Sequence, residues 1–570
     1  MPKPAKGLPF ERTPMLDALR ASGLPNGEPF DVLVIGGGIT GVGVALDAAA
    51  RGFRTALVER DDFASGTSSK SSKMVHGGLR YLQNGDVRLV YEALRERRRL
   101  MKNAPHLVAV SPFMIPILSK DGVVSRKVAR ALGSAMWMYD LTGGWRIGKL
   151  HKRISGKVAA EHFPTAHLDK LSAGYLYFDA EADDARLTLA VASTAAARGA
   201  TVANRCAVVS VETDEDGHAN GATVEADGDR FSVRARIVVN AAGVWADEVR
   251  ALDEGTHPDS IRPAKGVHMV IPWSKVRNDI AVIIPVRSDR RSLFIMPWGE
   301  NDDGTFRHAY VGTTDTDYDG PLDNPQCTAD DIDYMLTALN ESLTVSIERS
   351  DITGVWAGLR PLVNASASEG DQESTKDLSR QHQVAESSSG VIRVNGGKLT
   401  TYREMAEDTV DRVAAKLGKR GHATRRSSTR RLKLIGSDGS GPASRNLTEN
   451  HLWRRYGSAA DEIRALIAFN PELAEPLVMG QPYLRAEAVY AARNEMATTL
   501  DDVLMRRTRA HLFGRAATLD AAPRTAQLLA VELGWDAAET ERQINDYRQI
   551  CAEEEAASNE HYADVAHTTD

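Results

Sequence analysis

The sequence predicts an α/β fold in which two sheets are interleaved along the chain and a helical domain follows them. Three observations predict this fold. An apolar run at 31–35 leads into a glycine turn and a segment of small residues suited to a helix, as in a βαβ unit. Later apolar runs at 236–240 and 391–395 also end in turns that contain glycine. Alternating apolar residues between them indicate antiparallel strands, whereas helical spacing dominates after residue 446.

The composition is that of a globular protein with ample core. The chain has 570 residues, of which 42% are hydrophobic and 26% charged, with a formal net charge of −7. This argues against a disordered or fibrous chain, and no overall basic field calls for nucleic acid. Three widely spaced cysteines cannot form a disulfide framework or a four-cysteine metal site, so a reducing cytoplasm is expected.

Nothing in the first residues resembles a secretion signal, because no apolar core follows the initial lysines. No uninterrupted apolar run reaches the roughly 18 residues that span a bilayer, so membrane contact would be peripheral. Residues 1–29 contain six prolines and little periodicity, and we expect them to form an arm that leads into the first strand.

The first strand runs directly into the pattern G-x-G-x-x-G, formed by Gly36, Gly38 and Gly41. The first glycine allows a tight turn, the second lets a pyrophosphate approach the backbone, and the third lets the helix pack on the strand. The second strand, 55–58, ends at Glu59, whose carboxylate suits ribose hydroxyls. The free N–H groups of the helix amino terminus would face the phosphates.

FAD is the dinucleotide that the rest of the chain favours. Two more strands end in glycine turns, at Gly243 and at Gly397, and a nicotinamide enzyme would not need them. The segment 60–73 after the acidic residue is rich in hydroxyl groups that could follow a ribityl chain. A helix expected at 402–417 would direct its amino terminus toward negative charge on the flavin.

The alternation of strand types predicts interleaved domains. We expect a Rossmann-like, FAD-binding parallel sheet and a mainly antiparallel sheet that holds the substrate. The boundaries expected are as follows: an arm at 1–29; FAD-binding parts at about 30–110, 180–260 and 350–415; substrate parts at about 111–179 and 261–349; a linker at 416–446; and a helical domain at 447–570.

Four motifs in the same order carry a resemblance to a known family. They are SSKMVHGGLRYL at 71–82, AGLRPL at 357–362, DLSR at 377–380 and GGKLTTYREMAEDTV at 396–410. With the glycine turn they make the chain closely resemble the FAD-dependent glycerol-3-phosphate dehydrogenases. These are membrane-associated, quinone-reducing enzymes of the glycine oxidase and D-amino-acid oxidase fold group. The resemblance extends over nearly the whole chain, including a helical cap domain.

This resemblance implies oxidation of sn-glycerol 3-phosphate at C2 to dihydroxyacetone phosphate, with hydride passing to flavin and electrons to a membrane quinone. It also implies a set of site residues. The residues implied at the substrate are Arg80, Tyr81, His268, Arg360, Arg380 and Lys398. Those expected at the cofactor are Gly36, Gly38, Gly41, Glu59, Arg60, Ser71, Ser72, His76, Gly243, Gly397, Lys398, Leu399 and Thr400.

The chemistry of the substrate agrees with these residue types. A phosphate dianion is best held by the planar, bidentate fork of arginine, and Arg360 lies among apolar neighbours rather than in a solvated run. Removing the proton of the C2 hydroxyl suits a neutral histidine with an ordinary pKa of about 6.5. We favour His268 as this base, although the resemblance leaves the role open between it and the neighbourhood of Arg360.

A basic stretch at 88–157 holds 15 Lys and Arg against four acidic residues, together with apolar runs at 112–118 and 131–141. Taken alone, this pattern fits a solvated helix face as well as a surface that binds anionic lipid. The resemblance favours the second interpretation, a peripheral position on the inner face of the cell membrane, where the protein meets quinone.

We keep three hypotheses for the function. The first is the quinone-linked dehydrogenase; the second is an oxidase that passes electrons to oxygen; the third is a flavin-binding redox sensor without catalysis. The arginines, histidine and lysine around the flavin count against the third. No metal-binding motif and no G-x-S-x-G nucleophile turn occur. A homodimer is possible.

Overall fold

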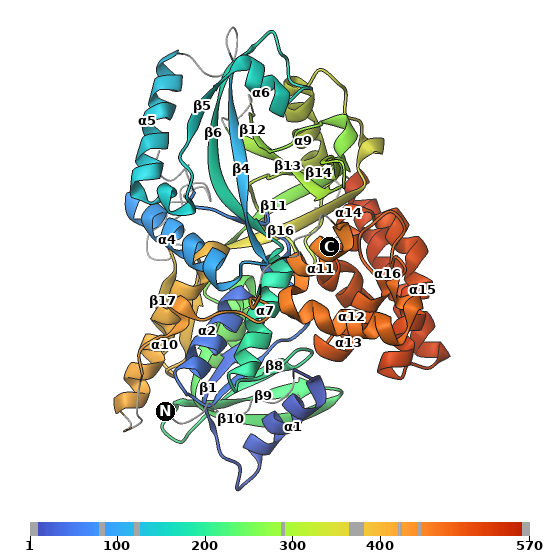
Figure 1. Cartoon of the computed structure of the whole chain (residues 1–570). Coiled ribbons are helices and arrows are strands. Elements are labelled where there is room, and N and C mark those ends of the chain that lie inside the picture. The colour runs from blue at the N-terminus through green and yellow to red at the C-terminus, as the bar shows by residue number, and fades with distance from the viewer. Residues whose placement is uncertain are drawn as a thin grey trace.

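The computed structural model describes residues 10–78, 86–118, 126–286, 291–363, 381–419, 421, 425–439, 441 and 446–560. Two sheets lie one above the other in Figure 1, and a helical carboxyl-terminal domain packs against the side of both. This is the predicted fold class, an α/β fold with a parallel sheet, a mainly antiparallel sheet and a separate helical part.

The first sheet is the predicted parallel one. Its strands follow the order β17-β18-β10-β1-β2-β7, and β8 and β9 extend it as an antiparallel ribbon from β10. The strands are β1 (Phe30–Ile35), β2 (Thr55–Val58), β7 (Thr201–Ala203), β8 (Ala207–Thr213), β9 (Ala219–Ala226), β10 (Asp229–Asn240), β17 (Gln383–Glu386) and β18 (Ile392–Asn395). The strands β18, β10, β1, β2 and β7 run parallel, so their carboxyl ends meet at one edge.

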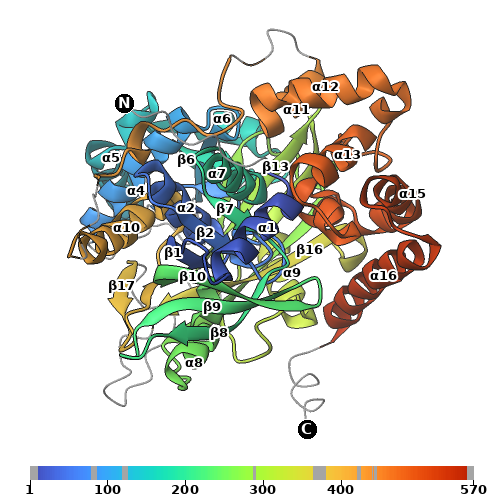
Figure 2. The same ribbon diagram turned by 90° about the horizontal axis from the view of Figure 1, so that it is seen from below.

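Different elements pack on the two faces of this sheet. On one face, Val32 and Val34 join a core with the helices α2 (Ile39–Ala50), α7 (Asp184–Ala197) and α10 (Tyr402–Lys419). On the other face, Leu33 packs with the β8–β9 ribbon and with the helix α1 (Arg12–Gly23). Figure 2 shows the ribbon and the three helices on opposite sides of β1. The apolar run Val32–Ile35 of β1 is therefore explained by burial on both faces.

The second sheet carries the predicted alternating strands. Its order is β15-β11-β14-β13-β12-β4-β6-β3, with β16 paired to β11 and β5 paired to β6. The strands are β3 (Met74–Val75), β4 (Val108–Leu118), β5 (Lys152–Ser155), β6 (Leu171–Ala182), β11 (Ile261–Pro272), β12 (Ala281–Pro285), β13 (Ser292–Glu300), β14 (Phe306–Gly312), β15 (Thr316–Asp317) and β16 (Gly354–Val363). All described pairings are antiparallel except β12 with β4.

The remaining helices form two groups. Some pack around the two sheets, and the others form the carboxyl-terminal domain. Those around the sheets are α4 (Val87–Asn103), α5 (Arg126–Thr142), α6 (Gly156–His162), α8 (Ala246–Glu254) and α9 (Ala329–Ser342). Those of the carboxyl-terminal domain are α11 (Leu447–Tyr456), α12 (Ala460–Phe469), α13 (Arg485–Asn494), α14 (Ala510–Phe513), α15 (Arg515–Leu533) and α16 (Ala537–Asn559), with a π-helix at Asp502–Arg507.

Three segments differ from the sequence expectation. The arm at 1–29 contains the helix α1, whose Met15, Leu16 and Leu19 are buried. The segment expected as a linker packs on the protein, because Leu432 and Leu434 are buried beside α4. The strand β16, placed beyond the boundary at about 350, belongs to the second sheet because it pairs with β11 along ten residues. The domain boundaries themselves stay a prediction.

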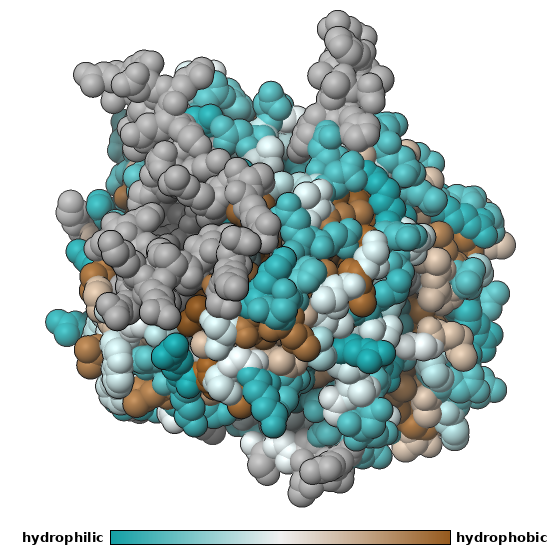
Figure 3. Space-filling view, turned by 90° about the horizontal axis from the view of Figure 1, so that it is seen from above, coloured by the Kyte–Doolittle hydropathy of each residue, from teal (hydrophilic) through white to brown (hydrophobic). Residues whose placement is uncertain are grey.

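Within the described residues no helix is both long and apolar enough to cross a bilayer. On the face seen in Figure 3, apolar residues occur in separate patches among hydrophilic ones. Such patches are ordinary on protein surfaces.

Candidate active site

The predicted dinucleotide turn lies where β1 passes into α2. Gly36 has a φ of +111°, a region that favours glycine. A side-chain carbon on Gly41 would lie 1.9 Å from the carbonyl oxygen of Gly36, so only glycine allows this helix to approach its strand. The Ser68 hydroxyl, which sequence analysis did not single out, accepts a hydrogen bond from the Ile39 N–H at the first helical position, at 2.9 Å.

Glu59 stands at the end of β2 and faces this turn. Its carboxylate accepts hydrogen bonds from the N–H groups of Gly37, at 2.5 Å, and Asp61, at 2.8 Å. Burial raises its pKa to about 7, although the two N–H groups oppose the rise. A buried carboxylate beside the turn can accept hydrogen bonds from ribose hydroxyls.

One cavity of about 220 Å³ joins the glycine turns of three parallel strands. The turns follow β1, β10 and β18, whose carboxyl ends lie at the same edge of the sheet, where such folds bind their ligands. The predicted cofactor residues that line it are Gly36, Gly38, Glu59, Arg60, Gly243, Gly397, Lys398 and Leu399. Residues from widely separated segments therefore form one elongated site that suits a dinucleotide.

At the far end of this site, hydrogen bonds between His76 and Thr400 connect the two sheets. The Thr400 hydroxyl accepts a hydrogen bond from the His76 N–H, at 3.2 Å, and donates to its carbonyl, at 3.3 Å. Thr400 belongs to the turn Leu399–Thr401 that precedes α10, and His76 follows β3. This places both predicted flavin contacts next to each other, where the parallel sheet meets the second sheet.

His268 and Arg360 share one face of the second sheet. They lie on the adjacent strands β11 and β16, in register so that His268 is opposite Trp356 and Arg360 is opposite Ala264. Because successive side chains alternate between faces, Val267 and Met269 enter the core beside α9, whereas His268 and Arg360 face the other way. Sequence spacing could not show that these two residues are neighbours on one face.

The environment of His268 fixes its ring. The Nε2 atom lies 2.8 Å from the Ser72 hydroxyl, and the ring is stacked on Trp356 with centroids 4.7 Å apart. Burial lowers its pKa well below 6.5, and the nearby charges of Lys73 and Arg360 lower it further. The imidazole is therefore neutral at physiological pH, as a proton acceptor must be.

Arg360 is held by groups of the segment that follows β14. Its guanidinium donates to the Asp315 carboxylate at 2.8 Å and to the carbonyl of Thr314 at 3.1 Å. Its side chain remains 22% exposed. Asp315 was not foreseen as a site residue, because the ion pair joins positions 45 apart in the chain.

Ser71 differs in its surroundings from the other predicted cofactor residues. Its hydroxyl donates to Asp184 at 2.7 Å, and the same carboxylate holds the fully buried ammonium of Lys73 at 3.1 Å. Arg509 of the carboxyl-terminal domain completes this group, with its guanidinium 2.7 Å from Asp184. The Ser71 side chain is thus engaged in a buried ionic network, which sequence motifs did not reveal.

Three predicted substrate residues, Arg80, Tyr81 and Arg380, lie outside the described residues. Among the residues that are described, no group of three or more His, Cys, Asp or Glu side chains is placed to hold a metal ion.

The donors and the shape of the cavity fit FAD. The three converging glycine turns and the carboxylate of Glu59 would hold its adenosine and pyrophosphate. Gly41 allows the helix to pack closely enough on its strand to form the first of these turns. The turn at Leu399–Thr401 and the face that carries His268 lie beyond them, where a flavin ring would meet a substrate. These features define a FAD-dependent oxidoreductase.

Comparison with known proteins agrees with this class. A family model described as "FAD dependent oxidoreductase" matches residues 31–403, and one described as "C-terminal domain of alpha-glycerophosphate oxidase" matches residues 427–540. Glycerol-3-phosphate dehydrogenase 2 of Mycobacterium tuberculosis is 39% identical over 542 residues, covering 91% of this chain and 88% of the relative. The human mitochondrial glycerol-3-phosphate dehydrogenase is 36% identical over 574 residues, covering 95% and 76%.

Solved structures give the same result. The glycerol-3-phosphate dehydrogenase of Bacillus halodurans, complexed with FAD, has a TM-score of 0.74 and 29% identity, and covers 95% of this chain and 98% of that one. The L-alpha-glycerophosphate oxidase of Mycoplasma pneumoniae, at 15% identity and a TM-score of 0.54, covers 71% and 98% and shares the fold. The chain belongs to the FAD-dependent glycerol-3-phosphate dehydrogenases, which confirms the predicted family and cofactor.

Proposed function

We propose that this protein oxidises sn-glycerol 3-phosphate to dihydroxyacetone phosphate at a membrane surface and passes the electrons to a quinone. The observation that supports the chemistry best is the position of His268 and Arg360 on one face of the second sheet, where His268 contacts the Ser72 hydroxyl. A neutral base and a cationic fork on one face match a substrate that combines a hydroxyl group with a phosphate.

Each residue has a definite task in this reaction. Arg360, fixed by Asp315, binds an oxygen of the substrate, and Lys398 at the cavity adds positive charge. His268 accepts the proton of the C2 hydroxyl at Nε2, the atom that faces Ser72. When bound, the flavin supplies the acceptor for the hydride that leaves C2. We keep Arg80, Tyr81 and Arg380 as further substrate contacts, as the family motifs imply.

Anaerobic addition of glycerol 3-phosphate to the purified holoenzyme tests the reaction, because the flavin absorption band should bleach. Arg360→Ala should lower kcat/KM for glycerol 3-phosphate at least about a hundredfold, since a charge-assisted, bidentate contact is lost. Its flavin spectrum should stay unchanged. Arg230→Ala, on an arginine 68% exposed in β10, serves as the control and should be normal. Near-normal turnover of Arg360→Ala would remove Arg360 from the site.

The electron acceptor is a separate question. The carboxyl-terminal family model is named after an alpha-glycerophosphate oxidase, which keeps oxygen as a second candidate acceptor. Stopped-flow mixing of the substrate-reduced enzyme with either oxygen or a soluble quinone analogue decides between them. We expect reoxidation by quinone at the rate of turnover and slow formation of hydrogen peroxide. The reverse order of rates would identify an oxidase.

A surface at the end of α5 supports the membrane position. Five large apolar side chains are exposed there, and we call them the α5 patch: Trp137, Met138, Leu141, Trp145 and Leu150. Leu141 is 76% exposed. The exposed lysines Lys149 and Lys152 lie on either side of Leu150 in the sequence. Apolar and aromatic residues beside lysines suit the interface of an anionic membrane, where each basic residue contributes about 1 kcal/mol.

Binding to lipid vesicles tests this surface. The holoenzyme should sediment with phosphatidylglycerol vesicles and much less with phosphatidylcholine vesicles. Leu141→Asp should lower this binding several-fold, because it places a negative charge in the apolar patch. Phe469→Asp is the matched control, since Phe469 is 91% exposed at the end of α12, outside the patch. Equal loss in both variants, or none in Leu141→Asp, would exclude the α5 patch as the membrane surface.

A further inference from the structure

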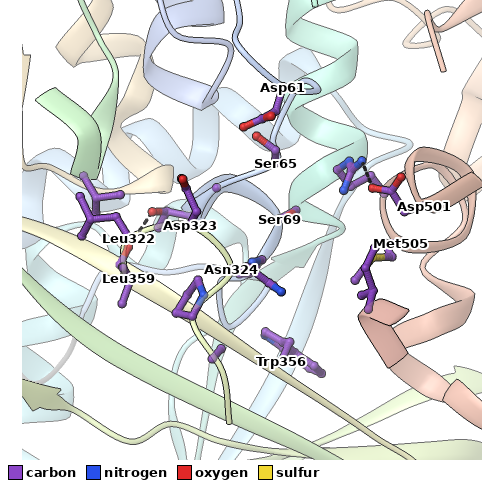
Figure 4. Close-up of a pocket in the computed structure, with 18 of the residues that line it drawn as sticks. Asp61, Ser65, Ser69, Leu322, Asp323, Asn324, Trp356, Leu359, Asp501 and Met505 are labelled. Atoms are coloured by element: carbon purple, nitrogen blue, oxygen red, sulfur yellow. Dashed lines mark hydrogen bonds and ion pairs between the residues drawn. The ribbon is translucent and has the colours of Figure 1, made fainter. Parts of the chain in front are cut away.

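A second large cavity, of about 560 Å³, lies between the cofactor domain and the carboxyl-terminal domain. Its walls come from the segment 60–70, from β16 and the 322–325 loop, and from residues of the π-helix and α16. Figure 4 shows Ser65, Ser69, Asn324 and Asp501 around one common space. A volume of this size is typical of sites for small molecules.

This cavity lies beside the dinucleotide cavity. Seven residues form the wall between them and line both: Arg60, Asp61, Ser65, Gly66, Thr67, Val244 and Trp245. Within this wall the Trp245 ring packs so closely on Gly66 that a side-chain carbon on Gly66 would lie 2.7 Å from the ring. Neither the glycine turn of β1 nor the turn before α10 reaches the second cavity. A ligand bound here would be separate from the cofactor.

Each carboxylate that lines the cavity already has a cationic partner. Asp61 and Asp323 are paired with Arg60, at 3.3 and 2.5 Å. Asp501 is paired with Arg506 at 2.8 Å. Glu554 lies 2.8 Å from His511. The lining acids therefore have little negative charge to offer to another cation.

Lys70 is the exception among the cations of this wall. The arginines that line the cavity are each within 4 Å of at least one carboxylate: Arg60, Arg205, Arg506 and Arg509. The half-buried Lys70 ammonium forms no ion pair or hydrogen bond with any described residue. Its backbone is fixed, because the Lys70 carbonyl lies against Gly358 of β16.

Neutral donors accompany this ammonium. The hydroxyls of Ser65 and Ser69 and the side-chain amide of Asn324 line the same cavity, and none of them hydrogen-bonds to a side chain or backbone group of the described residues. A lysine with two hydroxyls and an amide is a donor-rich set, and donors of this kind bind the oxygens of an anion.

We propose that this cavity is a second ligand site, which binds a small phosphate-bearing anion through Lys70, with Ser65, Ser69 and Asn324 as neutral donors. The charge balance supports an anion, because among the lining cations that the structure describes Lys70 is the one without an ion pair within 4 Å. The nearest carboxylates, Glu554 and Asp323, are already paired with His511 and Arg60. Burial lowers the pKa of Lys70 to about 8, and a bound anion would favour its charged form. Since both domains line the cavity, the ligand also stabilises their association.

Competitive acetylation measures occupancy of the site on the wild-type holoenzyme. Only the neutral amine reacts, so at pH 8 Lys70 should react readily unless an anion holds it protonated. Inorganic phosphate at about 20 mM should slow the acetylation of Lys70 at least fivefold, as a Kd of about 5 mM or lower requires. Sodium chloride at equal ionic strength should not, and neither salt should affect Lys275, which is paired with Asp351 outside the cavity. Absence of protection, or equal protection by chloride, would overturn the proposal.

Substitution of the lysine gives an independent result. Calorimetric titration of the holoenzyme with inorganic phosphate should show one phosphate fewer, or about tenfold weaker binding at one site, in Lys70→Gln. Lys70→Arg, which keeps the charge, should retain that site, and Lys275→Gln should match the wild type. Flavin content reports whether each variant is folded. A folded Lys70→Gln that binds phosphate as the wild type does would also overturn the proposal.

Discussion

Arg507 of the carboxyl-terminal domain makes a bidentate ion pair with Asp62 of the cofactor domain. Its two terminal nitrogens lie 2.5 and 2.8 Å from the two carboxylate oxygens, and both side chains are 0% exposed. Asp62 also accepts from Arg506 Nε at 2.5 Å and from the Asn204 amide at 3.0 Å. One carboxylate therefore satisfies donors from two domains, and its partner Arg507 lies 445 residues further along the sequence.

Replacing Asp62 should loosen the carboxyl-terminal domain. Asp62→Ala leaves Arg507 buried without its partner, and breaking a buried pair in this way costs about 3–5 kcal/mol. We expect the unfolding transition of the carboxyl-terminal domain within the holoenzyme to fall by roughly 10 °C. Differential scanning calorimetry provides the measurement. Glu225→Gln, which breaks the exposed pair with Arg230, is the control and should change little. An unchanged transition in Asp62→Ala would show that this pair does not hold the domains together.

Gly41 should be indispensable for binding the cofactor. In Gly41→Ala the new methyl group would lie 1.9 Å from the Gly36 carbonyl, so α2 and β1 must separate and the phosphate turn must open. The purified variant should contain little flavin, measured as the ratio of absorbance at 450 and 280 nm. Ala50→Gly, at the other end of the same helix, costs only about 1 kcal/mol of helix stability and should retain flavin. Normal flavin content in Gly41→Ala would contradict the role of this glycine.

The local parts of the fold could be predicted because strands, tight turns and helices depend on the types of residue that are close in sequence. The strand, turn and helix from Asp31 to Ala50 follow from apolar residues and glycines within 20 positions. The helix α1 was missed because prolines suggested an irregular arm. Pro14 lies in its first turn, where the missing N–H would have no helical partner in any case.

The pairings between distant segments could not be predicted. The sequence marks His268 and Ser72 separately, yet their contact joins residues 196 positions apart. The membership of β16 in the second sheet depends on its register with β11, which no local pattern records. The buried acids and arginines between the domains look like ordinary surface charges in sequence, because charged residues are mostly exposed. Their burial follows only from how the domains pack.

His268 should be neutral throughout the physiological range. Burial and the charges of Lys73 and Arg360 hold its pKa well below 6.5, and a general base acts in its neutral form, which exists above the pKa. The kcat/KM of the wild type should therefore show no loss attributable to His268 between pH 8 and 6.5. His268→Gln should lower kcat/KM about a hundredfold or more at every pH. A wild-type decline centred near pH 6.5 that disappears in His268→Gln would contradict this assignment.

The stability of the carboxyl-terminal domain should fall in mildly alkaline solution, because His511 gains a buried partner there. Its Nε2 lies 2.8 Å from Glu554, and its Nδ1 lies 2.8 Å from the Tyr547 hydroxyl. Burial alone would lower the pKa of His511, but the Glu554 carboxylate outweighs it and raises the pKa to about 9. A raised pKa contributes stability that is complete below the unfolded value of about 6.5 and is lost as the pH rises through 9. The contribution is on the order of 3 kcal/mol.

The thermal unfolding temperature, measured at intervals from pH 6 to 10, checks this prediction. It should decline between pH 7 and 9.5 in the wild type and decline less in His511→Gln, which has no proton to lose. His257→Gln, on a histidine 52% exposed, should follow the wild type. Once His511 is neutral, the nearest cation to the Glu554 carboxylate is Arg515, at 3.7 Å, which compensates the lost hydrogen-bonded pair only in part. A wild-type profile parallel to that of His511→Gln would mean that this histidine is neutral in the folded protein.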